Sequence, residues 1–167
     1  MSMKHLPFLT FFLLLAACGF TPMYGSGAGS LGVSATAGLD QVDIALIPDE
    51  SGVYLRNLLI DQFYQDGYPS SPTHSLQITD LEETESGLDI TVDSETTRKQ
   101  IRISAKVELI DHETGGIVLD RDMSALTSYN VLGSQFATRV SERDAREAAL
   151  GDLARQIETQ VALYFKR

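Results

Sequence analysis

The chain has 167 residues, and its 23 Asp and Glu against 13 Lys and Arg give it a formal net charge of -10 at pH 7. This acidic balance disfavours binding to the phosphates of DNA or RNA, so we expect no nucleic-acid partner. The chain contains one cysteine, which excludes an intramolecular disulfide framework.

The N-terminus has the pattern of a lipoprotein signal. Lys4 precedes an almost unbroken apolar run from Leu6 to Leu15. This run is shorter than the ~20 residues of a membrane-spanning helix and is typical of a secretory signal. Two small residues then lead to Cys18, whose thiol can take a diacylglyceryl group. We predict that residues 1–17 are a signal peptide and that Cys18 becomes the lipidated first residue of the mature protein.

An ordinary secretory signal cleaved near Ala17 is the alternative interpretation. It would leave Cys18 as an unpaired thiol in an exported protein, whereas lipidation gives this residue a role. The two or three acyl chains of a bacterial lipoprotein hold a membrane stably, and Gly19 lacks the acidic side chain that favours retention in the inner membrane. We expect an anchor in the outer membrane, on its periplasmic side, and a mature charge of -11 once Lys4 is removed.

Glycine, serine, alanine and threonine dominate the stretch from Gly19 to Gly38. So little apolar surface favours a flexible connection over a packed element. We predict a lipidated flexible tether over residues 18–39 and a single α+β domain over residues 40–167.

Two elements of different periodicity open this domain. Alternation of apolar and polar residues predicts a strand over about 41–47. Apolar residues at helical spacing then predict a helix over about 51–66, with Asp49 or Ser51 as its cap. The aromatic side chains that we expect in the core, rather than on a binding face, are Tyr54, Phe63 and Tyr64.

The second strand is less sharply defined. Leu76, Ile78 and later Leu88 alternate with polar residues, which predicts either one long bulged strand or two pieces separated by a turn over 82–87. The acid-rich stretch 80–95 lacks the Asp-x-Asp-x-Asp-Gly spacing of a calcium loop. We interpret this stretch as a solvated face.

The third strand has the strictest alternation in the chain. Its apolar face carries Ile101, Ile103, Ala105, Val107 and Leu109, and its polar face carries Arg98, Gln100, Arg102, Ser104, Lys106 and Glu108. A turn signal over His112–Gly116 predicts a hairpin into a fourth strand, from Ile117 to about Tyr129. The residues of this strand that we expect to point inward are Ile117, Leu119 and Met123.

A final helix completes the predicted fold. Ser141 and Asp144 resemble a capping box, and a stripe with i, i+4 spacing follows. The residues of this stripe are Ala145, Ala149, Leu153, Ile157, Val161 and Phe165. The order β-α-β-β-β-α predicts an α+β fold with two helices packed on one face of a four-stranded mixed sheet. The other face of the sheet should be polar.

No motif in the chain indicates catalysis. His74 and His112 are the histidines that remain after processing, and no serine, cysteine or carboxylate near them has the spacing of a nucleophile or a metal site. The glycine-rich stretch precedes the first strand, so it is not a phosphate-binding loop. We expect a protein that is not an enzyme and that has no cofactor and no metal site.

Several short stretches carry a resemblance to a known family. They are Cys18–Gly25, Thr97-Arg98, Val107–Asp111, Thr114–Leu119, Ser128–Val131, Ser134–Ala137, Glu142–Leu150 and Leu153-Ala154. In this order and spacing they resemble the LptE family of lipopolysaccharide-assembly lipoproteins, in its alphaproteobacterial form. The resemblance covers nearly the whole mature chain, and the family has the same order of elements.

The resemblance implies a partner rather than a reaction. Members of the family are a plug in the lumen of the outer-membrane β-barrel LptD and help lipopolysaccharide (LPS) reach the cell surface. A porin-sized barrel has a polar lumen, so a polar outer surface suits a plug. The alternative is a periplasm-facing lipoprotein that acts as an accessory binding subunit of another lipid-transport complex.

Basic residues are the candidate contacts with LPS, because LPS carries phosphates. The resemblance implies two contact positions, one on the sheet side and one before the last helix. Arg139 matches the second, whereas the acidic Asp93 stands near the first. Arg98, Arg102 and Lys106 are our substitute for the first position. Their alternative interpretation is the solvated or barrel-facing side of a strand.

Overall fold

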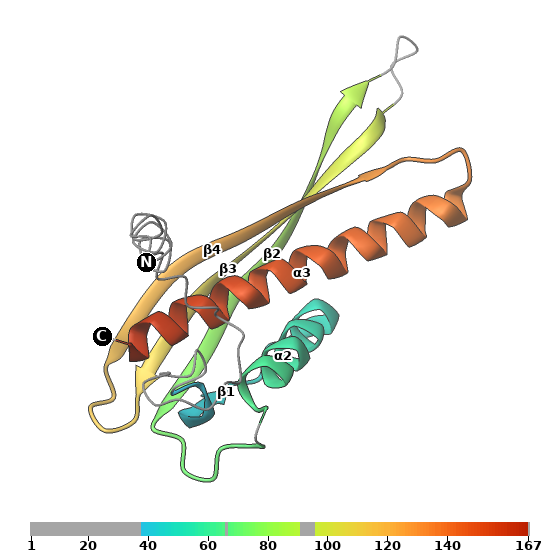
Figure 1. Ribbon diagram of the computed structural model, residues 1–167. Coiled ribbons are helices and arrows are strands. Elements are labelled where there is room, and N and C mark those ends of the chain that lie inside the picture. Colours follow the sequence, from blue (N-terminus) through green and yellow to red (C-terminus); the bar gives the residue numbers. More distant parts are fainter. Residues whose placement is uncertain (1–37, 66, 91–95, 167) are drawn as a thin grey trace, which may run out of the picture. The chain divides into compact units, whose positions relative to one another are not determined.

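The computed structural model describes residues 38–65, 67–90 and 96–166. The predicted signal peptide, Cys18, nearly all of the predicted tether and the acidic residues within 91–95 lie outside the described residues. The elements are the 3-10 helix η2 (Leu39–Gln41), β1 (Val42–Ile44), α2 (Asp49–Phe63), β2 (His74–Ile90), β3 (Thr96–Asp111), β4 (Ile117–Asn130) and α3 (Gln135–Phe165) (Figure 1). After η2, this is the predicted order of strands and helices.

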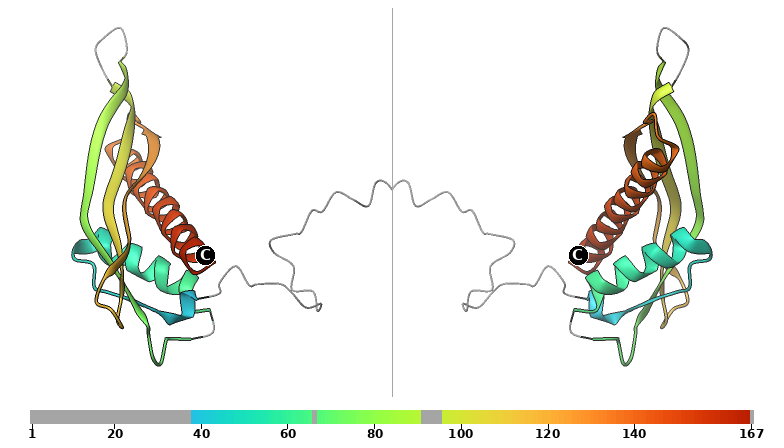
Figure 2. Two further views of the ribbon diagram at one scale, coloured as in Figure 1. Left: turned by 90° about the vertical axis from the view of Figure 1, so that its left-hand side faces the viewer. Right: turned by 90° about the vertical axis from the view of Figure 1, so that its right-hand side faces the viewer.

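The strands form one mixed sheet in the order β1-β2-β3-β4. β1 pairs with β2 in parallel, with Val42 opposite His74, while β2, β3 and β4 pair antiparallel. A parallel pair needs a crossover connection, which α2 supplies. Both helices lie on the same face of the sheet (Figure 2). The predicted fold class is therefore confirmed.

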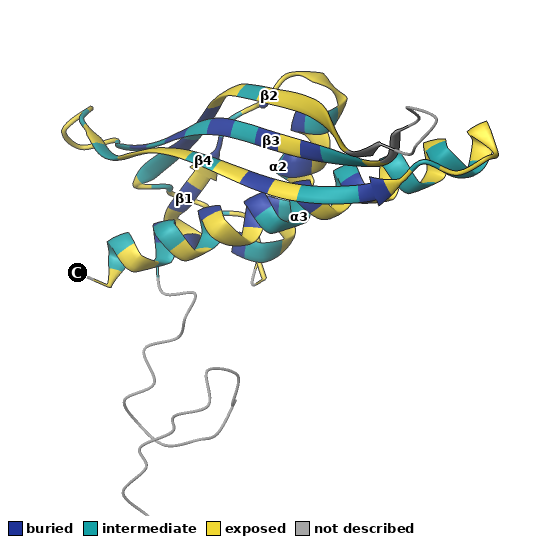
Figure 3. Cartoon of the chain, turned by 90° about the horizontal axis from the view of Figure 1, so that it is seen from above, coloured by how far each residue is buried: buried dark blue, intermediate teal, exposed yellow. Residues whose placement is uncertain are grey.

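One hydrophobic core lies between the helices and the sheet. Every residue of the predicted apolar face of β3 is buried, and the colours alternate along this strand in Figure 3. On α3 the stripe from Ala145 to Val161 is buried, whereas Phe165 is half-buried at the edge of the core. Leu150 and Ala154 widen this stripe into a face that can pack on a sheet.

α2 begins without the predicted side-chain cap. Pro48 occupies the cap position and no side chain accepts a hydrogen bond there, so the expectation that Asp49 or Ser51 caps the helix is wrong. Asp49 has a left-handed backbone, with φ 67°, and Gly52 packs directly against Ile47. A Cβ on Gly52 would lie 2.7 Å from Ile47 Cγ2 and 3.0 Å from the Ile47 carbonyl oxygen. Close backbone packing therefore fixes this helix start.

Side chains of α2 satisfy the backbone of the short strand β1. Tyr64, just after the helix, donates from its hydroxyl to Val42 O at 2.9 Å and accepts from Ile44 N at 3.2 Å. Arg56 donates from Nε and Nη2 to Ile44 O at 3.3 and 3.1 Å. Buried backbone groups need such partners. α2 therefore ends at Phe63 rather than near residue 66, because Tyr64 turns toward β1.

β2 is one long strand with a bulge rather than two pieces. Its register with β3 shifts between Thr79 and Glu82. The extra residue moves the helix-facing side of β2 from even to odd positions, so that Ile78 faces the core before the bulge and Glu83 and Glu85 face the helices after it. Both glutamates remain exposed, which agrees with the interpretation of the acid-rich stretch as a solvated face, but each is paired with a cation.

Arg146 of α3 binds Glu83 across the covered face of the sheet. Its Nε and Nη2 donate to the two Glu83 carboxylate oxygens at 2.6 and 2.8 Å, and Nη2 also donates to Glu142 at 2.8 Å. The hydrogen bonds with Glu83 and Glu142 raise the pKa of Arg146. This ion pair connects the middle of α3 to the part of the β2–β3 hairpin that extends past α2.

Glu85 has its own partners on the same face. It accepts hydrogen bonds from the hydroxyl of Tyr129 on β4 and from Lys99 Nζ on β3, the latter at 3.0 Å. The hydrogen bond from Tyr129 lowers the pKa of Glu85, with a smaller contribution from Lys99. Burial and the bond to Glu85 raise the pKa of Tyr129. The Glu85 carboxylate of β2 is thus joined to β3 and β4 by side-chain hydrogen bonds.

Two residues that were expected in the core are exposed. Ile117 is 54% exposed, because a register shift after Leu109 pairs it with Ile110 on the face away from the helices. Tyr54 is 37% exposed and lines a cleft between α2 and α3. The other residues of β4 that were expected to point inward, and that pack half-buried against the core, are Leu119 and Met123.

α3 begins at Gln135, well before the predicted start near Ser141. Ser134 is the cap residue, and its Oγ accepts from a backbone N–H at 3.5 Å. The prediction of a capping box at Ser141 and Asp144 is wrong, because both residues lie inside the helix. The turns before Ala145 contain no buried residue, so hydrophobic periodicity gave no signal for them.

Leu153→Asp and Ile103→Asp should each unfold the protein. Both side chains are buried in the core, and an unpaired charge there costs several kcal/mol against a net stability of ~5–15 kcal/mol. Leu163→Asp is the control on the same helix, because Leu163 is 49% exposed. Thermal unfolding followed by circular dichroism compares the three variants. A wild-type melting temperature for either core variant would contradict this packing.

Tyr129→Phe should raise the pKa of Glu85 toward its ordinary value. Because the pKa of Glu85 is lowered in the folded state, the contact contributes stability that is present above the unfolded-state pKa and is lost as the pH falls through the folded-state pKa. We expect the variant to lose about 1 kcal/mol of unfolding free energy at neutral pH and to lose less than the wild type on further acidification.

Carbon-13 NMR titration of the Glu85 carboxyl and urea unfolding at neutral and acid pH measure both effects. Tyr68→Phe is the matched control, because Tyr68 is 73% exposed. An unchanged Glu85 titration in the Tyr129 variant would contradict the assigned hydrogen bond.

Candidate functional site

The face of the sheet turned away from α2 and α3, here called the uncovered sheet face, carries the predicted strand cations. Even-numbered positions of β3 point to it, so the structure places Arg98, Arg102 and Lys106 there, as the alternation predicts. The residues of β2 and β4 that lie opposite or next to these cations in the register are Thr79, Glu82, Thr84, Ser86, Asp89, Asp120, Asp122, Ser124, Leu126, Ser128 and Asn130. The face is therefore mainly polar.

Lys106 is already paired with carboxylates. Its Nζ lies 3.1 Å from Glu108 Oε1 and 3.6 Å from Asp120 Oδ2. The hydrogen bond with Glu108, followed by the charge of Asp120, raises the pKa of Lys106. An anion that approached this ammonium group would also meet two carboxylates. Lys106 is therefore a poor contact for phosphate.

Arg102 has no carboxylate partner among the ion pairs of the described side chains, whereas Arg98 stands opposite Asp89 in the register between β2 and β3. Arg98 donates from Nε and Nη2 to Ser128 Oγ at 3.2 and 2.8 Å. This orients the guanidinium and leaves further donors of its fork available. Arg102 is exposed between Thr84 of β2 and Leu126 of β4. The cationic part of the face is thus the half toward the β2–β3 hairpin loop.

Arg139 does not join these strand cations. It is exposed near the start of α3, in the layer that covers the other face of the sheet. The four candidate cations therefore occupy two different surfaces, and Cys18, the predicted lipidation site, lies outside the described residues.

The partners of the cations were not part of the sequence prediction. Glu108 could have been found, because it follows Lys106 on the same face of the same strand. Asp120 and Ser128 depend on the register between β3 and β4, which the bulge after Leu109 sets. Alternation alone does not reveal such a bulge.

The cleft between α2 and α3 offers no unpaired cation to an anionic ligand. A cleft of about 340 Å³ between α2 and α3 is lined by Glu50, Ser51, Tyr54, Arg143, Arg146, Glu147 and Leu150. Both of its arginines are paired with carboxylates. Across residues 38–65, 67–90 and 96–166, no cluster of His, Cys, Asp and Glu is placed to hold a metal ion, and no helix has the length and apolar character to cross a membrane.

Solved structures of bacterial lipoproteins share this fold. A lipoprotein from Caulobacter crescentus matches with a TM-score of 0.62 at 18% identity, over 79% of this chain and 96% of that chain. A minor lipoprotein from Acinetobacter baumannii matches with a TM-score of 0.53 at 17% identity, over 73% and 88% of the two chains. Rare lipoprotein B from Shewanella oneidensis matches with a TM-score of 0.57 at 9% identity, over 74% and 92%. No curated protein sequence matches the chain.

The sequence match to a family extends over most of the fold. Residues 39–161 match the LptE family, whose description is lipopolysaccharide-assembly. The match runs from η2 into the last turns of α3 and so includes all four strands. It agrees with the resemblance found in the short stretches of the sequence. The chain therefore belongs to the LptE lipopolysaccharide-assembly family.

Proposed function

We propose that this protein is the plug subunit of the lipopolysaccharide translocon, which assembles with an LptD-type β-barrel and aids the delivery of LPS to the cell surface. A lipid anchor at Cys18 holds it to the outer membrane on the periplasmic side. The observation that carries the proposal is the match of residues 39–161 to a lipopolysaccharide-assembly family. The proposal assigns the protein a binding role and no reaction.

The distribution of polar and apolar residues suits a plug. The core lies between the sheet and the protein's own helices, and every buried residue of this core is apolar. The uncovered sheet face is polar along β3 and β4. The lumen of a large barrel is polar and water-filled, so a mainly polar face, on which Ile117 and Leu126 are exposed apolar residues, is suited to contact its wall.

Arg98 and Arg102 are the residues that we assign to contact with LPS. A guanidinium presents a fork of donors that matches phosphate, and Arg102 is exposed with no ion pair to a described side chain. Lys106 is paired with Glu108 and Asp120 and takes a minor part. Arg139 supplies a separate contact at the start of α3.

Co-purification tests the proposed partnership. Affinity-tagged protein extracted from outer membranes in mild detergent should bring with it a large β-barrel whose electrophoretic mobility changes on heating. An accessory subunit of another lipid-transport complex would instead bring a different transport protein and no such barrel. Absence of the barrel would overturn the proposal.

Cys18→Ala should abolish lipidation, because no other residue can form the diacylglyceryl thioether. Mass spectrometry of the mature N-terminus detects the added mass in the wild type and its absence in the variant. Ser26→Ala, in the same segment, is the control and should remain acylated. An acylated Cys18 variant, or an unmodified thiol in the wild type, would contradict the assigned anchor.

Arg98→Gln together with Arg102→Gln should weaken LPS binding while sparing the fold. Exposed polar substitutions usually change stability by less than ~0.5 kcal/mol each, whereas a charge-assisted hydrogen bond contributes ~1.5–3 kcal/mol. Lys106→Gln is the matched control and should have a smaller effect, because its charge is already paired. Wild-type binding should also weaken as salt is added.

Calorimetric titration with LPS at two salt concentrations and pull-down of the barrel measure the effect of these substitutions. Unchanged LPS binding with loss of the barrel would show that the uncovered sheet face contacts the barrel wall instead. If both assays are unchanged, the face has no binding role.

A further inference from the structure

The corner between β4 and α3 exposes a row of apolar side chains. Phe136 in the first turn of α3 is 79% exposed, and Leu132 and Val140, before and after it in the sequence, are also exposed. The three residues are spaced by four, which places Phe136 and Val140 on one side of the helix. Figure 1 shows that this corner extends away from the β2–β3 hairpin, and the turns of α3 before Ala145 bury no residue. Leu132, Phe136 and Val140 are here called the corner stripe.

Hydrogen bonds hold the loop of this corner against the helix. Thr138 Oγ1 accepts from Leu132 N at 2.9 Å and lies 3.1 Å from Leu132 O. Ser134 accepts from backbone N–H groups of the first turn, through its side chain at 3.5 Å and through its carbonyl at 3.0 Å. The corner stripe is therefore carried by a backbone that has its shape before any ligand arrives, which lowers the entropy cost of binding.

The charge of this corner is opposite in sign to that of the chain. Between Asp122 and Glu142 the sequence has 19 residues, and Arg139 is the one charged residue among them. The whole chain, by contrast, is 22% charged and has a net charge of -10. Arg139 is exposed next to Val140. A negatively charged surface therefore meets less repulsion at this corner than at the acidic parts of the domain.

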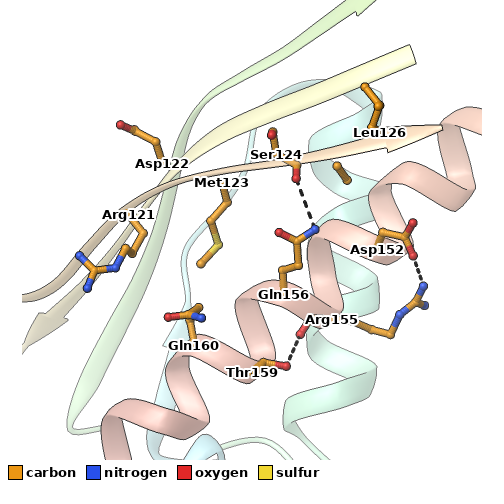
Figure 4. Close-up of a pocket in the computed structure, with 11 residues that line it drawn as sticks. Arg121, Asp122, Met123, Ser124, Leu126, Asp152, Arg155, Gln156, Thr159 and Gln160 are labelled. Atoms are coloured by element: carbon orange, nitrogen blue, oxygen red, sulfur yellow. Dashed lines mark hydrogen bonds and ion pairs between the residues drawn. The ribbon is translucent and has the colours of Figure 1, made fainter. Parts of the chain in front are cut away.

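Farther along α3 the exposed side is polar. Figure 4 shows a groove of about 870 Å³ between β4 and this helix. The residues that line it from α3 are Asp152, Arg155, Gln156, Thr159 and Gln160. Asp152 and Arg155 are paired with each other, and Gln156 donates from Nε2 to Ser124 O at 3.3 Å. An apolar ligand is therefore better suited to the corner stripe than to this groove.

We propose that the corner stripe docks on a phospholipid bilayer, with its three side chains at the boundary between headgroups and acyl chains and with Arg139 beside anionic headgroups. Burial of apolar side chains and attraction to anionic lipids act together at this boundary. A fluid bilayer can receive a projecting corner, whereas a protein partner would need a matching apolar pocket. This contact involves the lipoprotein before a barrel encloses it and does not rest on the proposed function.

The predicted lipid anchor keeps a bilayer within reach of the corner. The described domain begins at Gly38, which packs against Phe165 in the last turn of α3. The corner lies at the other end of this helix, which has 31 residues and a length of about 46 Å. The 19 residues between Cys18 and Gly38 can span about 65 Å when fully extended. The connection is therefore long enough for the corner to contact the membrane that holds Cys18.

Tryptophan fluorescence tests the docking. The mature chain, residues 18–167, contains no tryptophan and one cysteine, so Cys18 can be coupled to a maleimide lipid in vesicles of phosphatidylcholine and phosphatidylglycerol. The indole of Phe136→Trp should enter the bilayer, so its emission should shift to shorter wavelength and brominated lipids should quench it. Tyr68→Trp is the control, because Tyr68 is 73% exposed and follows Asp66 closely in the sequence. Equal quenching at both positions, or no quenching at either, would overturn the proposal.

Second substitutions in the Phe136→Trp chain separate the effects of charge and of apolar burial. Arg139→Gln should lower the ratio of docked to undocked protein about fivefold with phosphatidylglycerol present and leave it unchanged with phosphatidylcholine alone. Val140→Ser should lower this ratio several-fold with both lipids, whereas Leu46→Ser, at an exposed apolar position outside the corner, should have no effect. Circular dichroism verifies that the variants are folded. If Val140→Ser leaves the quenching unchanged but prevents recovery of the barrel from membranes, the corner stripe contacts protein and the proposal is overturned.

Discussion

Burial of one face of β3 against the helices is the constraint on which the rest of the structure depends. Alternate residues from Ile101 to Leu109 are buried, and the residues between them are left on the uncovered sheet face. A strand has a period of two, so a slip by one residue would exchange the faces completely. The polar surface of the sheet is therefore a direct product of the packing that holds the domain together.

The same constraint explains which elements could be predicted from the sequence. Alternation along β3 and the i, i+4 stripe of α3 are repeated signals, and both are found in the structure at the expected residues. Helix ends and bulges depend on single residues. Gly52 against Ile47 replaces a side-chain cap, and one extra residue after Thr79 turns Glu83 and Glu85 toward α3. Because each of these features depends on one or two residues, the periodicity of the sequence does not predict the helix start or the bulge.

The candidate site, too, could be predicted from the sequence only in part. Alternation correctly places Arg98, Arg102 and Lys106 on one face of a strand. It does not show that Lys106 is neutralised by Asp120, because Asp120 comes from another strand and its position depends on a register shift near the hairpin. It also cannot show that Arg139 belongs to the layer on the other side of the sheet. Charge partners are set by tertiary pairing, and a single sequence carries little information about it.

The two ends of the described domain meet at one place. Gly38 has a backbone φ of 94° and lies so close to the Phe165 ring that there is no room for a Cβ. A force transmitted along the chain from the predicted membrane anchor therefore acts on the domain at Gly38. It acts first on β1, which is three residues long, and on the last turn of α3. Tension applied at Gly38 would therefore separate these two elements from the domain before it reached the long strands.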